Sequence, residues 1–178
     1  LLSTSEINAT LVGDESLSSR PMLRIIKPLE KMNIDLSHEK GLLPIKVEKT
    51  NKKYFPTKHL LEIGSAQVKS AILFAALNIK GTTSIVEKVP SRDHTEIMLK
   101  YLGAKLKKEQ DLISLTSPNF LKPKDLCIPG DFSSAAFIIV AVLLSKKSKV
   151  IIKDVGLNFY RIGLLDVLLN MSSKIQIL

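Results

Sequence analysis

One feature restricts the fold of this chain more than any other: a sequence pattern that returns after about 70 residues. Three segments of the same shape begin at Leu29, Leu99 and Leu168, and so lie 70 and 69 residues apart. Each closes a predicted amphipathic helix, and alternating apolar and polar residues follow each one. Helices and strands alternate in any α/β protein, but three matching helices at near-equal offsets favour a true structural repeat.

A second pair of segments lies between these helices. Residues 65–73 and 133–141 are 68 residues apart, and each opens on serine and continues as a nearly all-apolar helix. A helix that is apolar on every side belongs in a core, so we expect both to be buried. Strand-like segments follow them, at 82–86 and 149–153. Two further stretches indicate hairpins: 105–116, with Gln110-Asp111 near its turn, and 43–47 with the strand after it.

The predicted unit is therefore a strand, a buried helix, a strand, an amphipathic helix and a hairpin of two strands. This order predicts an α/β (α+β) fold of repeated βαβαββ units, each about 70 residues long. The chain begins without methionine, and its last residues, 174–178, read as a strand interrupted in its course. We expect the chain to be a piece of a longer protein, with its fold incomplete.

Composition excludes several classes of protein. Hydrophobic residues make up 45% of the 178 residues and charged residues 24%, which excludes a disordered or fibrous chain. The single cysteine, Cys127, excludes a disulfide scaffold and a multi-cysteine zinc site, and we expect it to be a small buried residue in a reducing compartment. The longest apolar run, 135–144, is too short to span a bilayer, and no segment resembles a signal peptide. We therefore expect a cytoplasmic location and no membrane partner.

The charge allows more than one kind of partner. With 26 Lys and Arg against 17 Asp and Glu, the formal charge is +9, and a basic chain can bind nucleic acid through its phosphates. The lysines occur as isolated pairs, however, with no long basic run, no interleaved aromatic residues and no helix-turn-helix spacing. A solvated lysine-rich surface, or a basic cleft for small dianions, explains the charge equally well.

A domain boundary is predicted shortly after residues 118–124, which contain two prolines and show no periodicity. We interpret residues 1–126 as most of one domain. Residues 127–178 would be the start of a second domain, because the repeat begins again there.

Two polar segments could bind an anion. Arg20 stands before Pro21, a residue favoured in the first turn of a helix, and its guanidinium can grip a carboxylate or phosphate. By spacing alone, an exposed loop arginine is the simpler interpretation. Residues 64–67 open an apolar helix, where free N–H groups, the hydroxyl of Ser65 and the amide of Gln67 suit an anion. Capping of the helix by Ser65 is the simpler role there, and Gln67 needs a partner for its side chain.

Residues 91–96 and 129–134 also open helices. Arg92 could hold a phosphate. His94 is a possible acid–base group, although a lone histidine is more often structural, and no residue lies at metal-ligand spacing from it. Asp131 and Ser133 read first as helix caps.

Together these segments resemble the 5-enolpyruvylshikimate-3-phosphate synthase family. The resemblance lies in residues 13–22, 65–71, 91–96, 129–136 and 156–163, which follow the family's order. It implies an enolpyruvyl transferase-like fold of two domains, each with three βαβαββ units, in a monomeric protein. It also implies transfer of the enolpyruvyl group of phosphoenolpyruvate to the 5-hydroxyl of shikimate 3-phosphate, with release of phosphate and with no cofactor or metal.

The resemblance further implies roles for five residues. Arg20 would hold phosphoenolpyruvate. Ser65, Ala66 and Gln67 would line the shikimate 3-phosphate site, with Gln67 also touching phosphoenolpyruvate, and Arg92 would meet shikimate 3-phosphate. No catalytic residue is assigned within the chain, because the family's general-base aspartate, its early Lys-Ser…Arg segment and its later lysine, glutamate and arginines would lie outside it. We expect the chain alone to be inactive.

Two alternatives stay open. An enolpyruvyl transferase acting on UDP-N-acetylglucosamine would share the fold and phosphoenolpyruvate, although the Arg-Pro-Met and Arg-Asp-His-Thr-Glu motifs favour the shikimate enzyme. A basic nucleic-acid-binding module is the non-enzymatic alternative.

Overall fold

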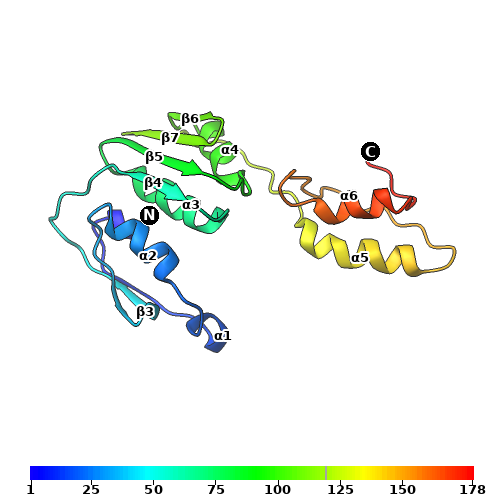
Figure 1. Cartoon of the computed structure of the whole chain (residues 1–178), viewed down its shortest axis with the longest axis horizontal. Helices are drawn as coiled ribbons and strands as arrows, with labels where there is room; N and C mark the ends of the chain where they lie inside the picture. The colour runs from blue at the N-terminus through cyan, green and yellow to red at the C-terminus, as the bar shows by residue number, and fades with distance from the viewer. Residues whose placement is uncertain (119) are drawn as a thin grey trace. The chain divides into compact units, whose positions relative to one another are not determined.

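The computed structural model describes residues 1–118 and 120–178, and these form two compact units, Leu1–Pro123 and Lys124–Leu178 (Figure 1). The division falls close to the predicted linker, of which Asn119 lies outside the described residues. The assignment of 1–126 and 127–178 to two domains of a longer protein stays a prediction. The α/β class of the fold is confirmed.

The centre of the first unit is one complete copy of the predicted order: β4 (Lys58–Leu61), α3 (Ala66–Ala76), β5 (Gly81–Glu87), α4 (His94–Tyr101), β6 (Leu106–Glu109) and β7 (Leu112–Ser117). The strands form one sheet in the order β4-β5-β7-β6. The β4–β5 pair is parallel, and the other two pairs are antiparallel. The hairpin predicted at 105–116 is confirmed as β6 and β7, with its turn at Gln110 and Asp111.

Buried and more exposed side chains alternate along these strands, so the sheet has one buried face and one face toward solvent. On β5, Thr83, Ile85 and Glu87 are buried, whereas the hydroxyls of Thr82 and Ser84 lie opposite hydroxyls of β7 on the outer face. A sheet with one solvated face is typical of antiparallel pairing. The buried face therefore needs a cover.

Helix α3 supplies that cover and is buried, as its apolar sequence predicts. It lies between the four-stranded sheet and α2 (Leu23–Glu30), so most of its residues are buried and only Gln67 is exposed (Figure 1). Ile72 and Leu73 have no exposed surface, and the amphipathic helix α4 adds Leu99 to the same core. The hydrophobic core of the first unit is centred on this helix.

A three-stranded sheet precedes this centre. Its order is β1-β3-β2, the order of β5-β7-β6, and its elements are the 3-10 helix η1 (Leu2–Thr4), β1 (Ala9–Leu11), α1 (Glu15–Ser18), α2, β2 (Ser37–Glu39) and β3 (Leu42–Val47). The hairpin predicted from 43–47 and the strand after it is wrong, because β3 pairs with β2, the strand before it. The turn is Lys40-Gly41, with φ of 51° and 74°, values that glycine adopts without strain and that suit a two-residue hairpin loop.

The three helix ends that define the sequence repeat also share one backbone geometry. Asn33, Gly103 and Ser172 follow α2, α4 and α6 (Gly163–Asn170), and all three have positive φ, at 64°, 93° and 59°. In each case the next amide donates a hydrogen bond back to the leucine that begins the repeated segment, at 2.9–3.2 Å. This is the left-handed helix cap in which a 6→1 hydrogen bond closes the last turn. The repeat is therefore structural as well as sequential.

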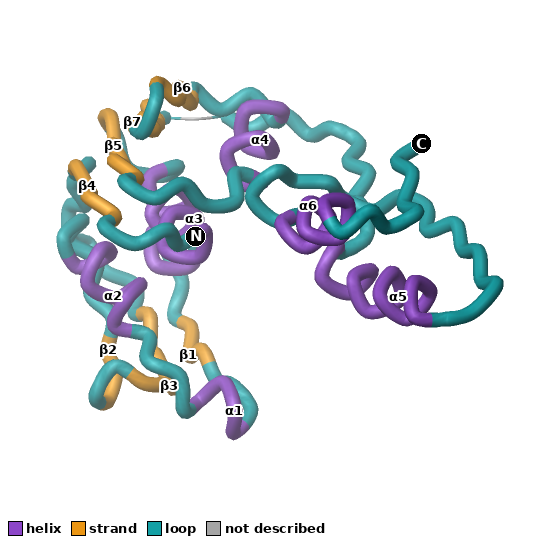
Figure 2. The backbone as a smooth tube through the Cα atoms, turned by 45° about the vertical axis from the view of Figure 1, so that its right-hand side comes forward, coloured by secondary structure: helices purple, strands orange, loops and turns teal. Residues whose placement is uncertain are grey.

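The second unit begins the same order without completing it. It holds α5 (Phe132–Leu144) and α6, and Figure 2 shows the rest of it as loop. The strands predicted at 149–153 and 174–178 are not formed. A single parallel bridge between Gly130 and Val155 occupies the position in the repeat that corresponds to the β4–β5 pair of the first unit. With no sheet to cover it, α5 is largely exposed, against our expectation of a buried helix: Phe137 is 80% exposed and Leu144 82%.

Among the described residues, none of the helices combines the length and the apolar character that crossing a membrane requires.

Candidate anion site at the start of α3

Ser65 stands immediately before α3 and caps it, because its hydroxyl accepts a hydrogen bond from the Val68 amide at 3.4 Å. The backbone N–H groups of Ala66 and Gln67 follow, at the end of the helix where amides lack intrahelical acceptors and the dipole is positive. The Gln67 side chain is exposed and has no hydrogen-bond partner among the described residues. The start of α3 therefore presents several donors to solvent.

The loop that carries Arg92 lies directly against this helix start. A Cβ added to Gly64 would fall 2.8 Å from the carbonyl oxygen of Val89 and 3.2 Å from that of Pro90. Both contacts are with backbone, which has little freedom to move aside. Glycine at position 64 is thus what lets the two loops approach so closely.

Arg92 and the start of α3 consequently share one edge of the first unit. Arg92 is exposed, and its side chain makes no hydrogen bond or ion pair with another described residue. Helix α4 begins two residues later, and the hydroxyls of Ser70 and Thr95 lie 2.7 Å apart, which joins the first turns of the two helices. A guanidinium, an amide side chain and free backbone N–H groups suit a small anion such as a phosphate ester.

A buried cluster of charges supports this edge from inside. The Nζ atom of Lys69 lies 3.0 Å from Glu87 Oε2 and 2.8 Å from Glu96 Oε1. Lys69 has no exposed surface, and the two carboxylate side chains are 3% exposed. Our sequence reasoning did not single out Lys69, although a lysine inside a nearly all-apolar helix was a signal that could have identified it.

Arg20 does not join this group through any contact of the described residues. It is exposed in the segment between α1 and α2, and its side chain has no hydrogen-bond or ion-pair partner there. Helix α2 begins at Leu23, so Pro21 lies outside its first turn, against our expectation. The Met22 amide donates to the Gly41 carbonyl at 2.7 Å, and this tie to the β2–β3 turn delays the start of the helix.

The second unit has a polar cluster of its own at the start of α5. Asp131 caps the helix through the Ser134 amide, as predicted, and its Oδ1 lies 2.5 Å from Arg161 Nη2. Ser133 is not a cap, since its hydroxyl accepts a hydrogen bond from Arg161 at 2.9 Å. Desolvation raises the pKa of Asp131, but hydrogen bonds from Ser134 and Ser133 and the charge of Arg161 together lower it below its usual range.

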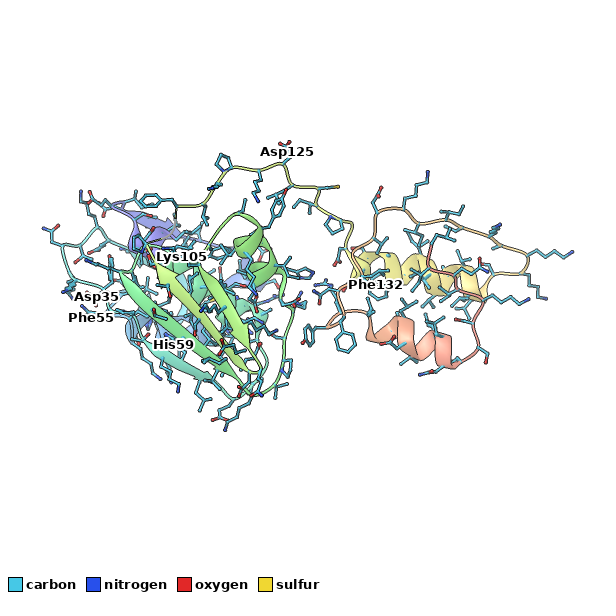
Figure 3. All side chains as sticks on the ribbon, turned by 90° about the horizontal axis from the view of Figure 1, so that it is seen from above. Asp35, Phe55, His59, Lys105, Asp125 and Phe132 are labelled. Atoms are coloured by element: carbon cyan, nitrogen blue, oxygen red, sulfur yellow. The ribbon has the colours of Figure 1, made fainter. Side chains whose placement is uncertain are left out.

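A buried histidine lies on the covered face of the sheet in the first unit. His59, labelled in Figure 3, is 3% exposed, and its Nε2 lies 2.6 Å from Thr57 Oγ1. Burial, followed by the positive charge of Lys31, lowers the pKa of His59 to about 4. The imidazole is therefore neutral near pH 7 and belongs to the core rather than to the anion site.

The remaining candidates take no part in a described site. His94 is the first residue of α4 and is exposed. Cys127 is exposed, against our expectation, because residues 120–129 form no helix or strand that could bury it. Within residues 1–118 and 120–178, no three His, Cys, Asp or Glu side chains gather as a set of metal ligands.

Comparisons with known proteins agree on one family. The family model for EPSP synthase (3-phosphoshikimate 1-carboxyvinyltransferase) matches residues 1–177. A 3-phosphoshikimate 1-carboxyvinyltransferase of Streptococcus pyogenes serotype M49 is 42% identical over 177 residues, which are 98% of this chain and 41% of that protein. An EPSP synthase structure from Acinetobacter baumannii superposes with a TM-score of 0.83 at 38% identity, over 97% of this chain and 40% of that one.

This chain spans about two fifths of the length of the curated relatives it matches. The match nevertheless runs through every motif of the sequence analysis, from residues 13–22 to 156–163. The chain belongs to the EPSP synthase family.

Proposed function

We propose that this chain contributes the shikimate 3-phosphate side of an EPSP synthase active site. In this proposal Ser65, Ala66 and Gln67 at the start of α3 bind the substrate together with Arg92. The observation that carries the proposal is the close approach of Gly64 to the 89–90 backbone, which sets these donors on one edge. A multiply charged anion is the ligand that such an edge favours.

Arg20 would meet phosphoenolpyruvate, with Gln67 shared between the two substrates. Support for this role comes from the motif around Arg20 and from its exposed guanidinium, which no described residue neutralises. The complete protein would transfer the enolpyruvyl group to the 5-hydroxyl of shikimate 3-phosphate. The 5-oxygen would form a C–O bond to the enolpyruvyl group while the C–O bond to the phosphate breaks, and the proton of the 5-hydroxyl would leave with inorganic phosphate. We further propose that this protein acts in the cytoplasm as a monomer.

Titration of the chain tests its share of this function. We expect shikimate 3-phosphate to shift the amide NMR signals of residues 64–67 and 91–93, and to do so more strongly than unphosphorylated shikimate. Duplex DNA serves as the competing ligand, because a nucleic-acid-binding module would bind it with a steep salt dependence. DNA binding without any response to shikimate 3-phosphate would contradict the proposal.

An activity assay tests a separate expectation. The 178-residue chain, incubated with both substrates, should release phosphate no faster than a blank without protein. Turnover well above that blank would mean that the chain carries catalytic groups that we have not assigned.

A further inference from the structure

Lys69 joins three elements of the first unit from a position with no exposed surface. Besides its ion pairs with Glu87 and Glu96, its Nζ donates to the backbone carbonyl of Ser91 at 3.3 Å. Glu87 ends β5, Glu96 lies in the first turn of α4, and Ser91 is in the loop between these elements. One ammonium group thus fixes both ends of the 88–93 loop and a point within it.

The stability of the fold does not by itself explain this cluster. A buried ion pair loses hydration, and well-packed apolar residues of similar volume often serve a core as well or better. The Glu96 carboxylate, apart from its ion pair with Lys69, has no hydrogen-bond partner among the described residues. The other buried residues of α3 are apolar, so an apolar side chain in place of Lys69 would fit the same core. The charges of the cluster therefore call for a role besides stabilising the fold.

The cluster holds the residue next to Arg92 by two groups. Ser91 accepts from Lys69 through its carbonyl and donates from its hydroxyl to Glu87 Oε1 in a short hydrogen bond. The Lys69 amide itself bonds to the Ser65 carbonyl at 3.0 Å, one turn from the start of α3. Lys69, four residues after the cap residue Ser65, therefore restrains the backbone next to Arg92.

We propose that Lys69, Glu87 and Ser91 are positioning residues that hold Arg92 beside the start of α3. The ligand in this inference, shikimate 3-phosphate, rests on the proposed function, whereas the restraint of the loop does not. Ser91 is the informative residue, because its hydroxyl can be removed while Glu87 keeps its ion pair with Lys69.

Hydrogen–deuterium exchange tests the restraint directly. In Ser91→Ala we expect the Lys88 amide, which donates to the Leu61 carbonyl at 3.1 Å where the loop begins, to exchange about tenfold faster, since a hydrogen bond from the loop to a charged acceptor is lost. Ser91→Thr keeps the hydroxyl and should restore slow exchange. Ser84→Ala is the matched control, because it removes a half-buried hydroxyl on β5 and its hydrogen bond with Ser114 on β7, and should leave this loop unchanged. Unchanged exchange in Ser91→Ala would overturn the proposal.

Ligand affinity tests whether the restraint acts through Arg92. Ser91→Ala should weaken the binding of shikimate 3-phosphate about tenfold and leave the binding of shikimate unaffected. In the background of Arg92→Ala, the additional Ser91→Ala substitution should cause no further loss of affinity. Equal losses with and without Arg92 would overturn the positioning role. A chain that never binds shikimate 3-phosphate would refute the proposed function instead, and the exchange experiment would still decide the restraint.

Discussion

Replacing Lys69 by methionine removes one partner of a fully buried ion cluster while nearly preserving side-chain volume. Glu87 and Glu96, each with 3% of its side chain exposed, would then lie close together in the core with no ammonium between them. Breaking a buried ion pair in this way costs about 3–5 kcal/mol. With a urea m-value of about 2 kcal/mol/M for a unit of this size, the unfolding midpoint should fall by about 2 M.

Urea unfolding followed by far-UV circular dichroism measures this loss. Lys80→Met is the matched control, because Lys80 is exposed just beyond the same helix and should change stability by less than about 0.5 kcal/mol. Lys69→Met combined with Glu87→Met and Glu96→Met, which replaces the whole cluster by apolar side chains of similar volume, should recover most of the loss, since no unpaired charge remains buried. A single variant within about 1 kcal/mol of the parent would refute the burial argument, as would a triple variant less stable than the single one.

Three further predictions concern the first unit, and two of them take their control substitution from the second unit. Folding lowers the pKa of His59 from 6.5 to about 4, so the unfolded state takes up a proton at higher pH than the folded state does. The free energy of unfolding should therefore fall by about 3 kcal/mol as the pH drops from 6.5 to 4. In His59→Gln the free energy of unfolding should depend less steeply on pH. Gly64→Ala should lower the free energy of unfolding by about 1–3 kcal/mol and displace the loop at residues 89–90. Gly163→Ala is the control and should be close to neutral, because its Cβ would meet nothing within 4 Å. Equal changes in melting temperature would contradict the close approach of Gly64 to the loop. Ile72→Ala, at a site with no exposed surface, should lower the free energy of unfolding by about 2–5 kcal/mol. Phe137→Ala, at a site on α5 that is 80% exposed, should lower it by less than about 1 kcal/mol. The reverse order in chemical denaturation would refute the packing of α3 described above.

Much of the fold could be predicted because its signals are local. The repeat at Leu29, Leu99 and Leu168 marks three helix ends, and each requires the same left-handed cap on the residue four positions later. The alternation in residues 105–116 similarly indicates a hairpin with one buried face. These patterns need only the period of the element and the chemistry of its end.

The parts that sequence analysis misplaced depend on partners far along the chain. Residues 133–141 are as apolar as α3, but a helix is buried only where a sheet covers it, and no such sheet forms around α5. The alternation in residues 43–47 does not say on which side the partner strand of β3 lies; that side is set by the Lys40-Gly41 turn, for which Gly41 is the sequence signal.

The candidate site shows the same division. Ser65 can be predicted as a helix cap from the sequence, and the motif of residues 91–96 indicates Arg92. Their common edge depends on Gly64 meeting the 89–90 backbone, which no periodicity indicates. The buried role of Lys69 is equally non-local, since its carboxylate partners come from β5 and α4.

The most direct test of the anion site compares two arginine variants by calorimetric titration with shikimate 3-phosphate. Arg92→Ala should weaken binding at least about tenfold, the loss expected for a charge-assisted hydrogen bond to a phosphate. Arg24→Ala removes the same charge from an exposed position on α2, outside the motifs, and should leave affinity unchanged. Equal affinities for Arg92→Ala and Arg24→Ala would contradict the assignment of the phosphate to this edge.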